Sequence, residues 1–107
     1  MLLITCYGPI PASFGKAQTF TLDGQFLQKF GIGQLQHPSS IAIDVDIVYV
    51  AEYGHHRVSV FSEGKFLKSF GAMGEAQGQF NGPYGVAVDA NGFVLVADQS
   101  NNRVQIF

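Results

Sequence analysis

Two pairs of oppositely charged residues recur in this sequence with the same spacing. Arg57 follows Glu52 by five residues, and Arg103 follows Asp98 by five residues. The forked donors of a guanidinium group suit a carboxylate or a phosphate, so each arginine could bind an anionic ligand or pair with the neighbouring acid. A carboxylate that ends one strand and an arginine that opens the next are close enough to pair across the loop. Because the pair occurs twice, we expect it to be a structural feature of a repeated unit.

Three histidines raise the hypothesis of a metal site. His55 and His56 are adjacent, and His37 precedes them in the chain. Histidine is the commonest metal ligand, but adjacent residues in a strand or a tight loop tend to point in opposite directions. The sequence also offers no convergent set of ligands with the spacing of a zinc site. We therefore predict no metal, no cofactor and no catalytic residue in this chain.

An internal repeat dominates the sequence. Residues 33–61 align with residues 78–107, and matching residues recur 45 or 46 positions apart. The slip of one residue falls where DVDI is replaced by DANGF, and turns tolerate such insertions. A partial third copy precedes these two, because FTLDGQFLQKFG at 20–31 is similar to FSEGKFLKSFG at 61–71. The chain is therefore built from copies of one unit.

Each full copy divides into four short strands. In the central copy we predict strands at Ser40–Asp44, Ile47–Glu52, Arg57–Ser62 and Phe66–Phe70. The strands are apolar on both sides, as in IAI, IVYV and VAV, which indicates a sheet covered on both faces. Four-stranded units of about 40–45 residues that stack face to face are the blades of a β-propeller. The predicted fold class is all-β, a partial β-propeller of about two and a half four-stranded antiparallel blades.

The residues shared by the two copies form a specific motif. It reads PSSIAID…VYVAEYGHHRVSVF and PYGVAVD…VLVADQSNNRVQIF. The chain has no Trp and no Gly-Gly pair, which sets aside the Trp-Asp and kelch types of propeller. The motif resembles the NHL repeat, in which an Asp-x-x-Asn-x-Arg segment follows the second strand. The central copy departs from that segment, with Glu52 in place of Asp and His55 in place of Asn.

The resemblance divides the chain into three units. With the strands of a blade lettered a to d, residues 1–31 supply strands b, c and d, and residues 32–71 form a complete NHL-like blade. Residues 72–107 supply strands a, b and c of a third blade. A closed propeller needs at least about four blades. We therefore expect a fragment of a longer protein, or a unit that self-associates into a ring, to complete the propeller.

The resemblance also implies which end of the blades binds a partner. In NHL propellers the b–c and d–a loops lie on one face, and loops on a rigid scaffold concentrate binding residues. We expect a partner to engage this face and not the side of the Glu63-Gly64 turn. The predicted binding-face residues are His37, Tyr53, His55, His56, Tyr84, Gln99, Asn101 and Asn102.

Composition narrows the class of partner. The net charge is −2 with only six lysines and arginines, which gives no general attraction to nucleic acid. No apolar run approaches the ~20 residues of a membrane-spanning helix, so we expect no membrane partner. A protein partner is the expectation, and RNA bound through the loop face is an alternative that the aromatic, His, Asn and Arg residues there would suit.

The resemblance therefore predicts a protein-interaction module and not an enzyme. Similar propellers form the C-terminal NHL domain of TRIM ubiquitin ligases, where the propeller selects the target. The RING, B-box and coiled coil of such ligases are not in this sequence, so any catalysis would belong to other parts of the protein. A second alternative is a fragment of a propeller lyase or lactonase. We expect a cytoplasmic location.

Overall fold

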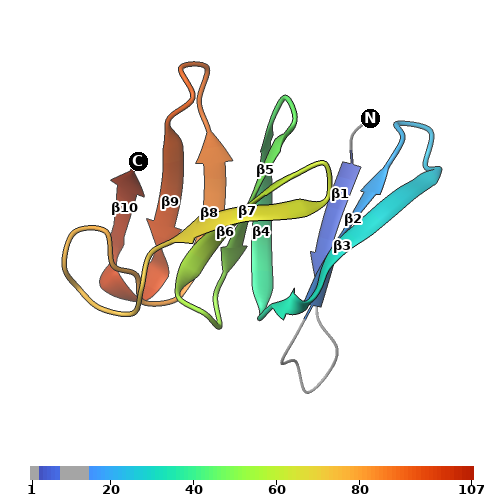
Figure 1. The fold of residues 1–107 in the computed structure, drawn as a ribbon. Coiled ribbons are helices and arrows are strands. Elements are labelled where there is room, and N and C mark those ends of the chain that lie inside the picture. The colour runs from blue at the N-terminus through green and yellow to red at the C-terminus, as the bar shows by residue number, and fades with distance from the viewer. Residues whose placement is uncertain (1–2, 8–14) are drawn as a thin grey trace.

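The protein is built almost entirely from β-strands, and our computed structural model describes residues 3–7 and 15–107 of it. Within these residues, ten antiparallel strands form three successive sheets, which fan out side by side (Figure 1). The first sheet contains β1 (Leu3–Tyr7), β2 (Gly15–Phe20) and β3 (Phe26–Leu35). The second sheet contains β4 (Pro38–Asp44), β5 (Ile47–Glu52), β6 (Arg57–Ser62) and β7 (Lys65–Phe70). The third sheet contains β8 (Pro83–Val88), β9 (Val94–Asp98) and β10 (Arg103–Ile106).

The three sheets confirm the predicted fold class of a partial propeller with about two and a half blades. Strands β5 and β6 have the predicted bounds, whereas β4 begins earlier, at Pro38, and β7 begins earlier, at Lys65. Strand β3 continues to Leu35, beyond the predicted end of the first unit at residue 31. The division of the chain at residues 31 and 71 therefore stays a prediction. Part of the first b–c connection, residues 8–14, lies outside the described residues.

Helical structure in the described residues is limited to one 3-10 turn, η1 (Gln99–Asn101). Within the same residues we find no helix long and apolar enough to cross a membrane.

The hairpin turns explain the slip of one residue between the two copies. In the second sheet, Asp44 pairs with Ile47, so only two residues connect β4 to β5, and the first of them, Val45, has a φ of 54°. In the third sheet the connection is longer, and the Asp89 carboxylate caps it by accepting hydrogen bonds from the amides of Asn91 and Phe93. Both turns reverse the chain, so the extra residue leaves the strands in register.

Apolar side chains fill the two spaces between successive sheets. Between the first and second sheets, Phe30 packs on Phe61 with ring centroids 4.9 Å apart. Between the second and third sheets, Val58 and Phe80 are completely buried against Val96. The inner strands β5 and β6 of the second sheet are thus largely buried, in keeping with their apolar sequences, whereas the outer strand β7 is mostly exposed.

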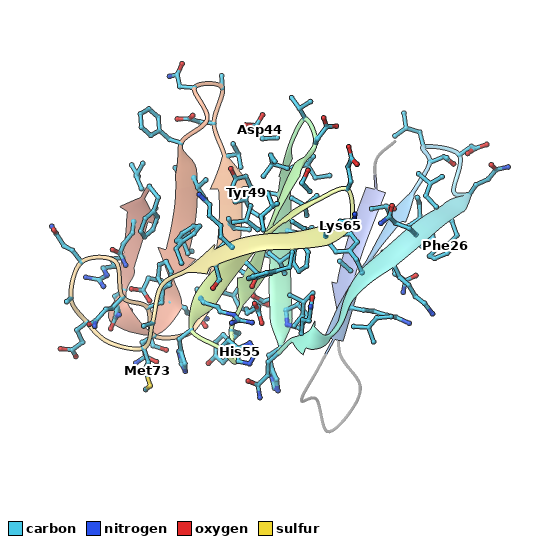
Figure 2. All side chains as sticks on the ribbon, in the orientation of Figure 1. Phe26, Asp44, Tyr49, His55, Lys65 and Met73 are labelled. Carbon is cyan, nitrogen blue, oxygen red and sulfur yellow. The ribbon has the colours of Figure 1, made fainter. Side chains whose placement is uncertain are left out.

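The two ends of the sheets differ in chemistry. We call the end formed by the b–c and d–a loops the loop face, and the end formed by the a–b and c–d turns the turn face. His55 and Met73 lie at the loop face and Asp44 at the opposite end (Figure 2). The loops are tied to one another by backbone hydrogen bonds, such as Tyr53 N–H to the His37 carbonyl at 3.0 Å.

Candidate functional site

A buried carboxylate organises the loop face of the second sheet. Glu52, the last residue of β5, has no exposed surface. Its Oε1 atom accepts a hydrogen bond from the backbone N–H of Gln36 at 2.9 Å and lies 2.5 Å from Nδ1 of His55. Its Oε2 atom accepts hydrogen bonds from Nε of Arg57 at 2.9 Å and from the hydroxyl of Ser59. One side chain therefore joins the d–a loop, the b–c loop and strand β6.

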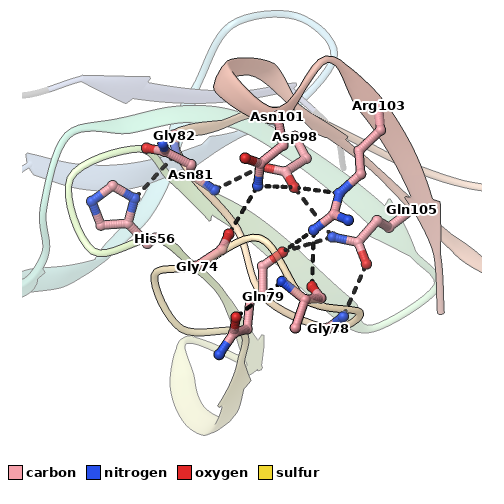
Figure 3. A network of polar contacts seen from close by, with 11 residues as sticks. His56, Gly74, Gly78, Gln79, Asn81, Gly82, Asp98, Asn101, Arg103 and Gln105 are labelled. Carbon is pink, nitrogen blue, oxygen red and sulfur yellow. Dashed lines mark hydrogen bonds and ion pairs between the residues drawn. The ribbon is translucent and has the colours of Figure 1, made fainter.

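The third sheet repeats this arrangement around Asp98 (Figure 3). Asp98 ends β9 and is also completely buried. Its carboxylate accepts hydrogen bonds from the backbone N–H of Asn81 at 2.7 Å, from Nδ2 of Asn101 at 2.9 Å and from Nε of Arg103 at 2.9 Å. Nε2 of Gln105 adds a fourth contact at 3.3 Å. We call each arrangement a carboxylate hub.

Each arginine also reaches beyond its carboxylate. Nη2 of Arg57 donates to the Gln34 carbonyl at 3.2 Å, and Nη2 of Arg103 donates to the carbonyls of Ala76 and Gln79, both at 2.9 Å. The arginine side chains are 29% and 30% exposed. The pairing that the five-residue spacing predicts is therefore present, and the bonds to the loop carbonyls extend it. Each arginine thus stays partly exposed while it is paired.

The hub of the third sheet lowers the pKa of the Asp98 carboxyl. Burial by itself raises the pKa of the Asp98 carboxyl, because it removes water from the charged group. The hydrogen bonds from Asn81, Asn101 and Arg103, with the positive charge of Arg103, outweigh this effect, so the pKa lies below its ordinary value. Each buried acid faces a guanidinium, as buried charges require.

The hub of the second sheet contains a histidine held by a carboxylate, and the hydroxyl of its Ser59 is bound to that same carboxylate. A histidine held by a carboxylate, as His55 is by Glu52, is the base-and-orienter half of a Ser-His-Asp type of site. Ser59 contacts the other oxygen of Glu52 and is buried beneath the loops. Nowhere in the described residues do three or more His, Cys, Asp or Glu side chains gather in a way that could hold a metal ion.

The seam between the second and third sheets brings together residues from both copies. Nδ1 of His56 accepts a hydrogen bond from the backbone N–H of Gly82 at 3.0 Å, so the b–c loop of one blade is tied to the d–a loop of the next. The Tyr53 ring packs beside Gly82 and meets the Tyr84 ring edge-on, with centroids 6.5 Å apart and an interplanar angle of 87°. We call His37, Tyr53, His56, Gly82 and Tyr84 the seam.

The structure sorts the predicted binding-face residues into two groups. The side chains of His55 and Asn101 turn inward to the hub carboxylates, and Nδ1 of His56 is occupied by Gly82. The remaining residues are exposed at the loop face, with Tyr84 at 54% and Tyr53 at 39%. The exposed group is His37, Tyr53, Tyr84, Gln99 and Asn102.

Sequence reasoning missed three polar residues that organise this face. Ser39 donates its hydroxyl to the carbonyl of Tyr84 at 2.7 Å and so links β4 to β8. Ser59 and Gln105 each follow a hub acid by seven residues. That common spacing was a usable signal, but the difference in residue type concealed it.

A comparison with protein-family models matches the NHL repeat at residues 35–61 and again at residues 80–107. These two segments contain both hubs. The chain belongs to the NHL repeat family. The matched segments of this NHL chain coincide with the two copies recognised in the sequence, so the resemblance of the motif is confirmed.

Curated relatives of this NHL chain include proteins from several animals. It is 54% identical over 39 residues to the E3 ubiquitin-protein ligase TRIM71 of Mus musculus, covering 36% of this chain and 5% of the relative. It is 44% identical over 54 residues to the protein lin-41 of Caenorhabditis elegans, covering 50% and 5%. It is 50% identical over 42 residues to the E3 ubiquitin-protein ligase TRIM32 of Homo sapiens, covering 39% and 6%. The chain therefore matches only a small part of each relative's length.

Proposed function

We propose that this NHL segment is a protein-interaction module, and that it contributes to the substrate-recognition region of a ubiquitin ligase of the TRIM-NHL type. The similarity to two proteins that are named E3 ubiquitin-protein ligases supports the ligase context. The observation that carries the interaction role is the loop face itself. Buried hubs fix its loops from beneath, while Tyr53 and Tyr84 remain exposed above them. Rigid, exposed aromatic residues are typical anchors of protein interfaces.

RNA binding is the second candidate for the same face. Single-stranded RNA is recognised by stacking of bases on aromatic rings and by contacts from arginine to phosphate, and the loop face offers both residue types. The arginines, however, already use Nε and Nη2 within the hubs. This leaves them less free to bind phosphate, so we favour the protein partner.

The test compares the two faces in the full-length protein. Tyr84→Ala removes an exposed ring from the loop face, and Phe93→Ala removes a ring of similar exposure, 51%, beside the turn at residues 89–93. We expect partners recovered by quantitative affinity purification to be lost with Tyr84→Ala and kept with Phe93→Ala. A recovered partner should also be ubiquitinated by the wild-type protein with purified E1 and E2 enzymes. Equal recovery by both variants would contradict the proposed role of the loop face.

A further inference from the structure

The seam presents two tyrosines whose backbones are fixed and whose rings are exposed. The Tyr84 carbonyl accepts a hydrogen bond from the Ser39 hydroxyl of the neighbouring sheet at 2.7 Å. The Tyr53 N–H donates to the His37 carbonyl at 3.0 Å. Tyr53 is nevertheless 39% exposed, and Tyr84 is 54% exposed. A partner that covers them would bury aromatic surface. Because the backbone is already fixed, binding would cost little conformational entropy, which favours affinity.

The Tyr53 ring packs against Gly82, which has no side chain to obstruct it. A side chain at position 82 would place Cβ 2.8 Å from Cε2 of Tyr53, closer than atoms can approach. Gly82 also has a φ of 68°, which residues with a Cβ rarely adopt, and its N–H is held by His56. The position of the ring is therefore set by the backbone of the third sheet as well as by its own loop.

The angle between the rings indicates what kind of group fits there. A nucleobase that intercalates needs two parallel aromatic faces with a gap between them, whereas Tyr53 and Tyr84 meet at 87° and are in contact. Two perpendicular rings instead form a corner that can receive the side chain of a leucine or a proline. The geometry therefore argues against a base sandwiched between the two rings and suits an apolar side chain of a peptide.

The two faces differ in which charged side chains are most exposed. On the loop face the acids of the hubs, Glu52 and Asp98, have no exposed surface, whereas Arg57 and Arg103 are each about a third exposed, at 29% and 30%. In each ion pair the arginine is therefore the partner that a ligand can reach. The acids exposed at the turns of the opposite end are Asp23, Asp46, Glu63 and Asp89, and one exposed lysine, Lys65, lies beside the Glu63-Gly64 turn. Within the described residues the d–a loops add one exposed acid, Glu75.

We propose that the seam binds an extended acidic peptide, which places one apolar side chain in the corner between Tyr53 and Tyr84. Carboxylates that flank this side chain lie toward the exposed edges of Arg57 and Arg103. Tyr53 opens the b–c connection and Arg57 is the first residue of β6 after it, so a peptide of a few residues reaches both, at about 3.3 Å per extended residue. This proposal rests on the proposed interaction function and specifies the partner of the same face.

The test is selection of random peptides displayed on phage against the immobilised full-length protein. We expect the recovered sequences to carry a leucine, proline or other apolar residue between aspartates and glutamates. A fluorescein-labelled synthetic peptide of the recovered consensus should bind about tenfold or more weakly to Tyr53→Ala and Tyr84→Ala, in keeping with loss of an aromatic hot spot, and unchanged to Phe93→Ala. Binding should also weaken as salt concentration rises. Thermal unfolding of each variant checks that the fold is kept, and Tyr84→Phe, which retains the ring, should bind like wild type.

Several results would overturn the proposal. Recovery of basic or neutral peptides, of no peptide, or of peptides whose binding ignores both tyrosines would show that the seam does not select acidic segments. A labelled uridine-rich RNA that binds and depends on both tyrosines, while the acidic peptide does not, would assign the seam to RNA. If Tyr84→Ala abolishes capture of partners whose binding segments are not acidic, the proposed function stands and this inference fails. If binding of the acidic peptide depends on the tyrosines but capture of partners does not, the seam binds acidic peptides and the proposed function fails.

Discussion

Oδ2 of Asp98 lies 2.9 Å from Nε of Arg103 and 3.3 Å from Nε2 of Gln105, so one buried oxygen joins two side chains of the same strand. In the second sheet, Oε2 of Glu52 makes the corresponding contacts with Arg57 and Ser59. The longer acid is paired with the shorter partner, and the shorter acid with the longer partner. The two hubs therefore occupy the same place in the blade. In one the acid is the longer side chain, and in the other its partner is the longer one.

The difference in length predicts coupling between positions 98 and 105. Asp98→Glu adds a methylene group to a fully buried site, which we expect to lower the free energy of unfolding by about 1–3 kcal/mol. Gln105→Ser removes the bonds that Nε2 donates to Asp98 and to the Gln79 carbonyl and the bond that Oε1 accepts from the Gly78 N–H, a loss of about 1–3 kcal/mol. The double variant reproduces the pairing of Glu52 with Ser59, so its loss should be smaller than the sum by about 0.5–3 kcal/mol. Urea unfolding of all four proteins measures this coupling, and strict additivity would contradict it.

The lowered pKa of Asp98 predicts loss of stability in acid. A carboxyl whose pKa is lower in the folded state than in the unfolded state stabilises the fold above its ordinary pKa of about 3.9. That contribution is lost as the pH falls through the folded value, while Arg103 stays charged. Asp98→Asn should therefore lower the free energy of unfolding at pH 7, and its difference from wild type should shrink toward pH 3. Glu75→Gln, at an exposed acid of the d–a loop, is the control. A difference that stays constant with pH would rule out this linkage.

The hydrogen bond from Gly82 to His56 predicts that His56 is structural. Because His56 has a φ of 53°, alanine there would add backbone strain, so glycine is the cleaner substitution. We expect His56→Gly to lower the free energy of unfolding by about 1–3 kcal/mol, because the buried amide of Gly82 loses its acceptor. His56→Asn should retain most of the stability, since asparagine accepts a hydrogen bond and tolerates positive φ; the third sheet has Asn102 there, with a φ of 54°. Thermal unfolding in which both variants behave like wild type would show that this link is unimportant.

Close contact between Gly71 and Phe80 predicts a backbone position that tolerates no side chain. Gly71 has a φ of 99°, and a Cβ there would lie 2.3 Å from Cδ2 of the completely buried Phe80. Gly71→Ala should lower the free energy of unfolding by about 2–5 kcal/mol, from about 1–2 kcal/mol of backbone strain plus steric overlap. Gly92→Ala, at a φ of 86° with nothing within 4 Å, should show the strain alone. Equal losses in the two variants would mean that Phe80 moves aside freely.

Much of the fold could be predicted because the sequence repeats itself. Apolar runs that recur at a common offset located the strands, and the common spacing of each acid and its arginine predicted the ion pairs. The turn at residues 89–92 could also be predicted from its residue types. The Asp89 carboxylate accepts backbone hydrogen bonds there, and Gly92 adopts a positive φ. These features depend on residues close together in the chain.

The contacts of the loop side chains and the contacts between blades were harder to predict from the sequence. His55 and Asn101 are polar residues in loops, which on sequence alone indicates a surface, yet their side chains turn inward to buried acids. The link from His56 to Gly82 depends on a left-handed backbone conformation at position 56, which nothing in the residue type requires. The bond from Ser39 to Tyr84 joins strands of different sheets. The last two contacts join different sheets, so they depend on how the sheets stack, and that geometry is set by the whole core.

The outer side of the third sheet predicts how these 107 residues behave when expressed alone. Val104 and Ile106 of β10 are 62% and 65% exposed, whereas the matching residues of the second sheet, Val58 and Val60, are 0% and 2% exposed. An uncovered apolar sheet with an unpaired edge strand favours pairing with another chain. We expect sedimentation at micromolar concentration to show oligomers, and Val104→Lys with Ile106→Lys to shift them toward monomer. Val45→Lys, at a residue 81% exposed in a turn, should change nothing. A wild-type monomer that melts in a sharp cooperative transition would show that the sheets need no neighbour on this side, because contacts within and between the three described sheets would then suffice.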